Sequence, residues 1–191
     1  LLKHKAQLEL FYKFVFMIKR IAISGAPGTG KTTLIEELSK RDFKCNPEIS
    51  REIIAQELKI GGNITPWGNL NAFSKVVIAK RLEQFNAAKE PIEFFDRSIM
   101  DSIAYLIKDK LSISQEWDFL AKNNRYYSKV FITPPWEAIY KSDSERLEDF
   151  ETATAIHSYM IEAYEKYNYQ VIIVPKVSIE ERIQFILKHI E

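Results

Sequence analysis

One eight-residue segment constrains this chain more than any other feature. It reads Gly25-Ala26-Pro27-Gly28-Thr29-Gly30-Lys31-Thr32 and matches the pattern G-x-x-x-x-G-K-[S/T] in full. The run before it, residues 19–24, is short and mostly apolar and predicts a strand, whereas residues 31–40 carry apolar side chains at helical spacing. A strand, a glycine-rich turn and a helix in this order form a loop that binds phosphate.

The chemistry of such a loop requires this spacing. Its glycines let successive backbone N–H groups point into one concavity, and the positive end of the following helix adds to the attraction for an anion. Lys31 is expected to reach the β- and γ-phosphates, and the Thr32 hydroxyl is expected to bind Mg²⁺. We therefore predict that the segment from Gly25 to Thr33 binds ATP or GTP, since the sequence contains no motif that reads the base.

The rest of the chain alternates between the two element types. Strands are predicted over residues 19–24, 43–46, 92–95, 129–132 and 170–174, and helices over residues 31–40, 49–58, 70–89, 99–108, 115–122, 145–167 and 179–190. This alternation predicts an α/β fold in three layers, with a five-stranded parallel sheet covered by helices on both faces. The length allows one domain, expected over residues 17–191. Residues 1–16 fit the pattern poorly, and we interpret them as an N-terminal extension that ends before Met17.

Composition excludes several classes of protein. Lys plus Arg number 27 and Asp plus Glu 26, a formal net charge of +1, which gives no electrostatic footprint for duplex nucleic acid or an anionic membrane surface. The single cysteine, Cys45, excludes an internal disulfide framework, and the three histidines are too far apart in the sequence for a histidine-built metal site. No stretch has the about 20 apolar residues that a membrane-spanning helix needs. The protein is therefore expected to be cytoplasmic.

A second acidic site follows the strand predicted at residues 92–95. Asp96 at the carboxyl end of this strand is expected to meet the Mg²⁺ held by Thr32, because ligands bind at that edge of such sheets. The alternative is an ordinary aspartate that caps the next helix. Arg97 comes next, where motor ATPases of the AAA+ class usually have a glutamate that orients water. An arginine stabilises a transferring phosphoryl group but provides no base for water, so transfer to an acceptor fits better than hydrolysis.

Several further motifs carry a family resemblance. With the phosphate loop they are Pro47 to Glu52, Phe95 to Ser98 with Asp101, Ala104-Tyr105, Arg125-Tyr126, Phe131 to Trp136, Asp143 to Arg146 and Glu180 to Arg182. From about Arg20 to Leu187 the sequence resembles the NadR-like AAA-domain ATPases. These are short P-loop proteins similar to ribosylnicotinamide kinase and, more distantly, to deoxynucleoside and thymidylate kinases. The resemblance implies a P-loop NTPase fold of the nucleoside-kinase type.

The region from about residue 47 to residue 90 is the predicted acceptor region. Glu48 follows the second predicted strand, where the related nucleoside kinases carry an acid that handles the acceptor hydroxyl, so Glu48 is a candidate general base. Arg51 and Arg97 are candidates to bind the acceptor, and Arg51 is also a candidate to hold Glu48 in place. The alternative for Glu48 is an acid at a helix start that pairs with a surface arginine.

The predicted lid region covers residues 134–150. Arg146 is the candidate there to contact the phosphates during catalysis, because its planar guanidinium suits bidentate contact with phosphate. A plain surface pair with Asp143 or Glu145 is the alternative. Two tryptophans that follow prolines, Trp67 and Trp136, have faces that suit stacking on a base, but we interpret both as anchors of the core or the lid.

These features predict a Mg²⁺-dependent phosphotransferase. Its partners would be a nucleoside triphosphate and a small hydroxyl-bearing acceptor such as a nucleoside-like metabolite. The alternative from another class is a nucleotide-controlled binding switch, or a slow NTPase, with a protein or lipid partner. A closed acceptor pocket that contains Glu48 favours the kinase, whereas an exposed apolar patch beside a lid favours the switch.

Overall fold

The computed structural model describes residues 18–140 and 149–190. The strands are β1 (Lys19–Ser24), β2 (Lys44–Asn46), β3 (Ile92–Asp96), β4 (Lys129–Ile132) and β5 (Gln170–Ile173). The helices are α2 (Lys31–Ser39), α3 (Ser50–Ile60), α4 (Leu70–Ala87), α5 (Ile99–Lys108), α6 (Gln115–Asn123), α7 (Phe150–Lys166) and α8 (Ile179–Lys188), with a short 3₁₀ helix η1 (Glu137–Ile139). The predicted alternation of strands and helices is confirmed.

The five strands form one parallel sheet in the order β2-β3-β1-β4-β5. From the central strand β1 the chain runs through α2 to the β2 edge, whereas from β3 it crosses to β4 on the other side. Ligands of such sheets bind beyond the carboxyl ends of the strands, at the point where the connections leave in opposite directions. That point lies between β1, which leads into the phosphate loop, and β3, which ends at Asp96.

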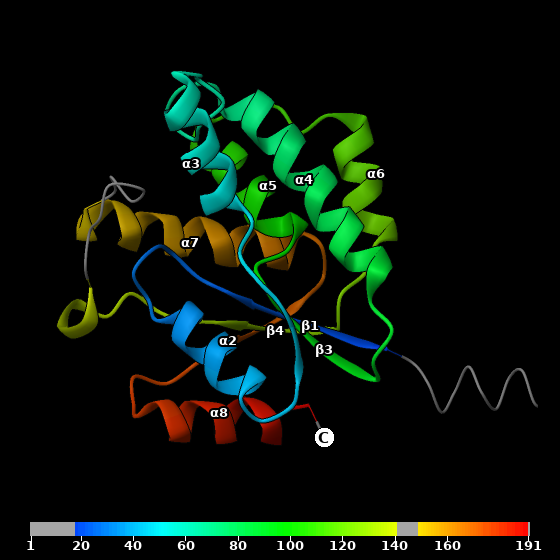
Figure 1. Ribbon diagram of the computed structural model, residues 1–191, viewed down its shortest axis with the longest axis vertical. Helices are drawn as coiled ribbons and strands as arrows, with labels where there is room; N and C mark the ends of the chain where they lie inside the picture. Colours follow the sequence, from blue (N-terminus) through cyan, green and yellow to red (C-terminus); the bar gives the residue numbers. More distant parts are fainter. Residues whose placement is uncertain (1–17, 141–148, 191) are drawn as a thin grey trace, which may run out of the picture.

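Helices cover both faces of the sheet, because side chains alternate along each strand (Figure 1). Ala22 of β1 faces the core cluster that α4, α5 and α7 contribute to, while Ile21 and Ile23 face the cluster formed with α2 and α8. Both clusters are built from side chains with almost no exposed surface. The three-layer arrangement and the fold class are therefore confirmed.

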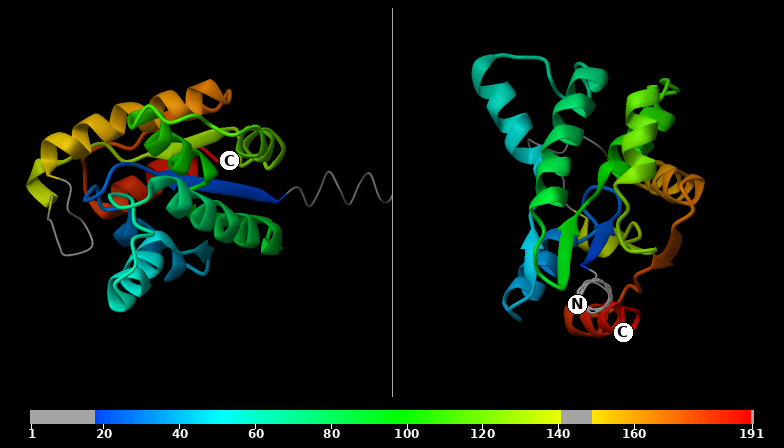
Figure 2. Two further views of the ribbon diagram at one scale, coloured as in Figure 1. Left: turned by 90° about the horizontal axis from the view of Figure 1, so that it is seen from above. Right: turned by 90° about the vertical axis from the view of Figure 1, so that its right-hand side faces the viewer.

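A third, smaller core cluster lies away from the sheet. It joins α3, α4 and α5 through the buried side chains Ile54, Leu70, Phe73, Val77 and Leu106. In Figure 2, α3 and the start of α4 project beyond the sheet, on the side where the carboxyl ends of the strands lie. This cluster gives the region after β2 a rigid apolar wall of its own.

Some predictions concern residues outside these ranges. The N-terminal extension at residues 1–16 and the stretch 141–148 of the lid region, which includes Arg146 with Asp143 and Glu145, lie outside the described residues. The predicted helix over residues 145–167 begins in the described part at Phe150, where the Asp149 side chain accepts a hydrogen bond from the N–H of Thr152. Within the described ranges, no helix is both long and apolar enough to cross a lipid bilayer.

Candidate active site

The phosphate loop joins the end of β1 to the start of α2, and two of its glycines are required by the geometry. Gly25 and Gly30 have φ angles of +140° and +81°, which L side chains rarely adopt. A Cβ on Gly25 would lie 2.4 Å from the hydroxyl oxygen of Thr133, and one on Gly30 would lie 3.0 Å from a guanidinium nitrogen of Arg182. The fixed glycines of the motif therefore permit both the turn and its close packing.

Lys31 is the buried cation of this loop. Its Nζ donates hydrogen bonds to the carbonyl of Ala26 at 2.8 Å and to the hydroxyl of Thr29 at 3.4 Å. Burial, reinforced by the charge of Arg97, lowers the pKa of Lys31 to about 7, although nearby acids oppose this shift. A charged ammonium held in so dry a place gains much from an anion brought beside it. Thr32 and Thr33 are exposed and line the same cavity.

Asp96 ends β3 next to β1, where it is paired in register with Ile23. Its Oδ1 is buried and has no hydrogen-bond partner among the described residues. Burial, together with the negative charge of Glu48, raises the pKa of Asp96 to about 6. The alternative that Asp96 caps the next helix is wrong, because Ser98 is the N-cap of α5 and forms a capping box with Asp101.

The donor set around Asp96 fits a magnesium ion. An unpaired, buried carboxylate oxygen suits a cation, and both Asp96 and Thr32 line the same cavity. In the part of the chain that the structure describes, no three His, Cys, Asp or Glu side chains are grouped to hold a metal. Mg²⁺ is commonly bound by one or two carboxylates, substrate phosphates and water, so this sparse set is adequate.

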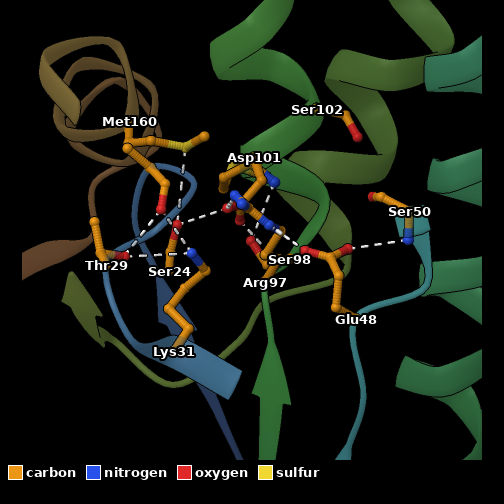
Figure 3. Close-up of polar contacts among 12 residues, drawn as sticks. Ser24, Thr29, Lys31, Glu48, Ser50, Arg97, Ser98, Asp101, Ser102 and Met160 are labelled. Carbon is orange, nitrogen blue, oxygen red and sulfur yellow. Dashed lines mark hydrogen bonds and ion pairs between the residues drawn. The ribbon is translucent and has the colours of Figure 1, made fainter. Parts of the chain in front are cut away.

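Arg97 bridges two acids instead of standing free in the cavity. Its side chain pairs with Glu48 through Nε and with Asp101 through Nη1, the latter at 3.0 Å (Figure 3). Burial opposes the charge, but Glu48 and Asp101 raise the pKa of Arg97 well above its ordinary value. Its backbone has a φ of +76°, and its N–H donates to the carbonyl of Ile23 at 2.9 Å. The arginine is thus fixed at both ends.

Glu48 lies between the end of β2 and the start of α3 and is almost enclosed. Besides Arg97, it accepts a hydrogen bond from Nη2 of Arg81 at 3.3 Å and from the backbone N–H of Ser50 at 3.1 Å. Burial opposes ionisation, yet the charges of Arg97 and Arg81 outweigh it and lower the pKa of Glu48 to about 2. The alternative of a surface ion pair is wrong, because both arginines are buried. Arg51 lies in the first turn of α3 and lines the same cavity.

Sequence reasoning missed the role of Arg81 in α4. Its side chain is 2% exposed and donates to the Ser98 carbonyl and, at 3.2 Å, to the Ser102 hydroxyl as well as to Glu48. An arginine in a helix ordinarily indicates a solvated face. The available signal was its spacing, since Val77, Arg81 and Phe85 share one helix face and the other two are buried.

Two other buried polar residues support the site. Asp101 accepts hydrogen bonds from the Ser24 hydroxyl at 2.6 Å and from the Tyr164 hydroxyl at 2.8 Å, so it links β1, α5 and α7 below Arg97. Arg182 of α8 donates to the carbonyl of Thr29 at 3.2 Å and so braces the phosphate loop from below. Both residues belong to the motifs that carry the family resemblance, but the sequence alone does not indicate these contacts.

One cavity of about 280 Å³ brings the site together. Its phosphate end is lined by residues 27–33 and Asp96, its acceptor end by side chains of α3, α4 and α5, and Glu48 and Arg97 line it as well. Trp67 also lines this cavity and is 45% exposed, so it is not an anchor of the core, while a role as an anchor of the lid stays a prediction. Trp136 is half-buried, just before η1.

Comparison with solved structures agrees with this fold. A deoxyadenosine kinase from M. mycoides with dCMP and dCDP bound has a TM-score of 0.63 at 18% identity, over 90% of this chain and 97% of that one. A thymidylate kinase from Ehrlichia chaffeensis has a TM-score of 0.63 at 17% identity, over 91% and 98%. A NadR protein in complex with NR has a TM-score of 0.68 at 16% identity, over 94% of this chain but 52% of NadR.

The family is established by sequence. No curated protein matches the chain. A family model described as an AAA domain, however, matches residues 20–182, which is most of the chain and includes the phosphate loop, Glu48, Asp96 and Arg97. This match and the fold of the solved structures confirm the resemblance seen in the motifs. The chain therefore belongs to this AAA-domain family and has a P-loop fold of the nucleoside-kinase type.

Proposed function

We propose that this protein is a Mg²⁺-dependent kinase that transfers the γ-phosphoryl group of ATP or GTP to a hydroxyl group of a small acceptor. The observation that carries this proposal is the position of Glu48. An ionised carboxylate, held between Arg81 and Arg97, lines the same cavity as the phosphate loop. A nucleotide-controlled switch needs no such carboxylate, and a motor ATPase of the AAA+ class usually has a glutamate that orients water directly after this aspartate, where this chain has Arg97.

At the phosphate end, the chain supplies backbone and one cation. The N–H groups of the loop and the ammonium of Lys31 hold the triphosphate, and this contact favours the charged form of a lysine whose pKa burial has lowered. Thr32 and Asp96 are the residues that would hold Mg²⁺. When bound, the ion neutralises charge that develops on the phosphate oxygens.

At the acceptor end, Glu48 orients the attacking hydroxyl. With a pKa of about 2 it is a weak base, so it accepts a hydrogen bond from the hydroxyl and takes the proton only as the new P–O bond forms. Phosphoryl transfer tolerates a weak base, because its transition state is loose and depends mainly on positioning and on charge stabilisation. Arg97 contributes charge next to this point, and Arg146 is proposed to add a second contact to the phosphates.

The similar solved structures support a small acceptor. Two of them are kinases named for deoxyadenosine and thymidylate, and the third holds NR. A fold of this type places a triphosphate and a small molecule at one sheet edge, and the cavity of this chain has the corresponding two ends.

The test is a metabolite library incubated with Mg²⁺ and either ATP or GTP, with phosphorylated products sought by mass spectrometry. With the acceptor found, Arg97→Ala should lower turnover on the order of 10² while nucleotide affinity changes far less. Arg97→Lys should restore little, because a point charge cannot bridge Glu48 and Asp101. Arg41→Ala, which removes a partly exposed arginine paired with Glu180 away from the cavity, is the control.

Thermal unfolding of each variant separates loss of chemistry from loss of structure, because Arg97→Ala leaves two buried acids without their partner. Fast ATP hydrolysis without any acceptor, indifferent to Arg97→Ala in a folded variant, would contradict the kinase.

A further inference from the structure

The acceptor end of the cavity has an apolar side and a polar side. The apolar side consists of side chains from α3, the α3–α4 turn, α4 and α5, namely Ile54, Trp67, Leu70, Phe73, Val77 and Tyr105. The polar side consists of residues that lie nearer to Glu48 in the sequence or in its contacts, namely Ser50, Arg51, Arg81 and Ser102. Ile54, Leu70, Phe73 and Val77 are at most 8% exposed and belong to the core cluster that contains Leu106. These side chains are fixed by packing, so they form a preformed apolar wall that faces the acceptor.

This wall is poorly suited to a nucleobase. Proteins recognise base edges with paired donors and acceptors, most often through the amides of Asn and Gln or through Arg. Among the described residues, no asparagine or glutamine lines the cavity, and two of its three arginines, Arg81 and Arg97, are already paired with Glu48, while Arg51 lies at the start of α3. A base placed against Phe73 and Val77 would bury its polar edge without partners, and a buried unpaired polar group is costly.

Trp67 supplies a further observation. Its indole is 45% exposed although it lines the cavity, and the turn that carries it is well ordered. The Gly68 N–H donates to the Thr65 hydroxyl at 3.0 Å, and the Asn69 N–H donates to the Thr65 carbonyl at 3.1 Å. An ordered turn that presents a large aromatic face at a cavity provides a surface for an apolar or aromatic group.

The cavity also offers an isolated polar atom at this end. The hydroxyl of Ser74 in α4 is buried and has no hydrogen-bond partner in the described ranges. Ser74 lines the cavity between Phe73 and Val77 in the sequence of α4. One polar atom on an otherwise apolar acceptor would satisfy this hydroxyl.

From these contacts we infer, resting on the proposed function, that the acceptor is an alcohol whose body is an aromatic or branched apolar group with about one polar atom, and not a nucleoside. Its hydroxyl lies at Glu48, and its body packs against Phe73 and Val77 and is covered by Trp67. The phosphate loop determines what donates the phosphoryl group, and this wall determines what receives it.

The experiment measures binding and transfer separately on the full chain. Benzyl alcohol, 3-phenylpropanol and 3-methylbutanol are compared with ribose, cytidine and adenosine. Binding is followed by tryptophan fluorescence and calorimetry, and transfer by mass spectrometry with ATP and Mg²⁺. We expect the apolar alcohols to bind saturably, with a fluorescence change that Trp67→Phe removes, and to have a kcat/KM at least tenfold above that of the nucleosides.

A matched pair of variants localises the effect. Trp67→Ala removes an exposed side chain and should raise the KM for the apolar alcohols about tenfold, the usual range for one stacking contact, without changing nucleotide affinity. Phe119→Ala in α6 removes another exposed aromatic, one that does not line the cavity, and should change neither.

Three outcomes would overturn or support the inference. Preferred phosphorylation of ribose or a nucleoside, insensitive to Trp67→Ala, overturns the inference and leaves the kinase intact. Absence of any binding of the apolar alcohols also overturns it. Binding of these alcohols that depends on Trp67, without transfer of phosphate to any compound, supports the inference about the acceptor while it rejects the proposed kinase activity.

Discussion

The two ends of the cavity are built in different ways. The phosphate end is one contiguous stretch, residues 25–33, which acts mainly through its backbone and needs glycine where other chain segments approach. The acceptor end is assembled from side chains of three consecutive helices and a turn, spread over residues 48–105. A backbone loop recognises a feature that all triphosphates share, whereas a set of side chains recognises one particular body.

The two ends also differ in how their charges are held. Lys31 is buried with its charge disfavoured, as its lowered pKa of about 7 indicates, and it requires an anion from outside. Glu48 is buried with its charge favoured, since Arg97 and Arg81 lower its pKa to about 2. The phosphate end is therefore electrostatically incomplete without its ligand, while the acceptor end is complete in advance. Preorganised charge of this kind is the usual basis of rate enhancement.

The sharpest test of this division is Glu48→Gln. The change removes the charge that orients the acceptor hydroxyl, so turnover with an acceptor should fall by about 10² to 10⁴, the range for a positioned acid or base. Nucleotide affinity, measured by calorimetry, should stay within about twofold, because a glutamine keeps most of the hydrogen bonds to Arg81 and Ser50. Glu52→Gln, at an exposed position in the helix α3 that follows Glu48, is the control. A large loss of nucleotide affinity in a folded Glu48→Gln protein would show that the two ends are not separable.

The converse variant is Lys31→Ala. It should weaken binding of the triphosphate by about 10- to 100-fold, as expected for one charge-assisted contact to phosphate, while binding of an acceptor alone is unchanged. Thermal stability should not fall, because the ammonium is disfavoured by burial until an anion is present. Lys40→Ala, just after the same helix, removes an exposed lysine for comparison. Near-equal affinity for ATP in Lys31→Ala and wild type would remove the main support for the phosphate end.

The smallest expected effect is that of Arg81→Lys. A lysine retains the charge near Glu48 but cannot also reach Ser98 and Ser102, so Glu48 should be less well oriented. We expect kcat to fall by about three- to tenfold with little change in nucleotide affinity, in keeping with one weakened hydrogen bond. Steady-state kinetics would measure the change in kcat, and calorimetry would measure the change in nucleotide affinity. An increase in the Kd for nucleotide with unchanged kcat would instead place Arg81 with the phosphate end.

The difference between the two ends also explains which parts of the fold and the site could be predicted from the sequence. The order of strands and helices follows from apolar periodicity, because the three central strands β1, β3 and β4 are mostly buried and most helices bury one face against them. The phosphate loop could be predicted because its geometry depends on adjacent residues, and a short sequence motif contains all of them. Asp96 and Glu48 could be placed because one ends a strand and the other comes two residues after a strand, and the carboxyl ends of parallel strands share one edge.

The partners of these residues could not be predicted, because they depend on packing between elements distant in the sequence. Arg81 lies 33 residues from Glu48, and its spacing from Val77 and Phe85 indicates burial in α4 but not the partner that it would contact. Large aromatics are usually buried, which favours a core position for Trp67, but its turn presents it at the cavity. Specificity depends on contacts of this long-range kind.

The left-handed backbone at Arg97 has a consequence for attempts to stabilise this protein. A φ of +76° is unfavourable for any residue with a side chain, by about 1–3 kcal/mol, and glycine would adopt it without strain. A glycine, however, could not bridge Glu48 and Asp101. Removing one partner of a buried ion pair costs about 3–5 kcal/mol, which exceeds the strain that glycine would relieve. Arg97 is therefore a strained position that a stabilised variant should leave unchanged.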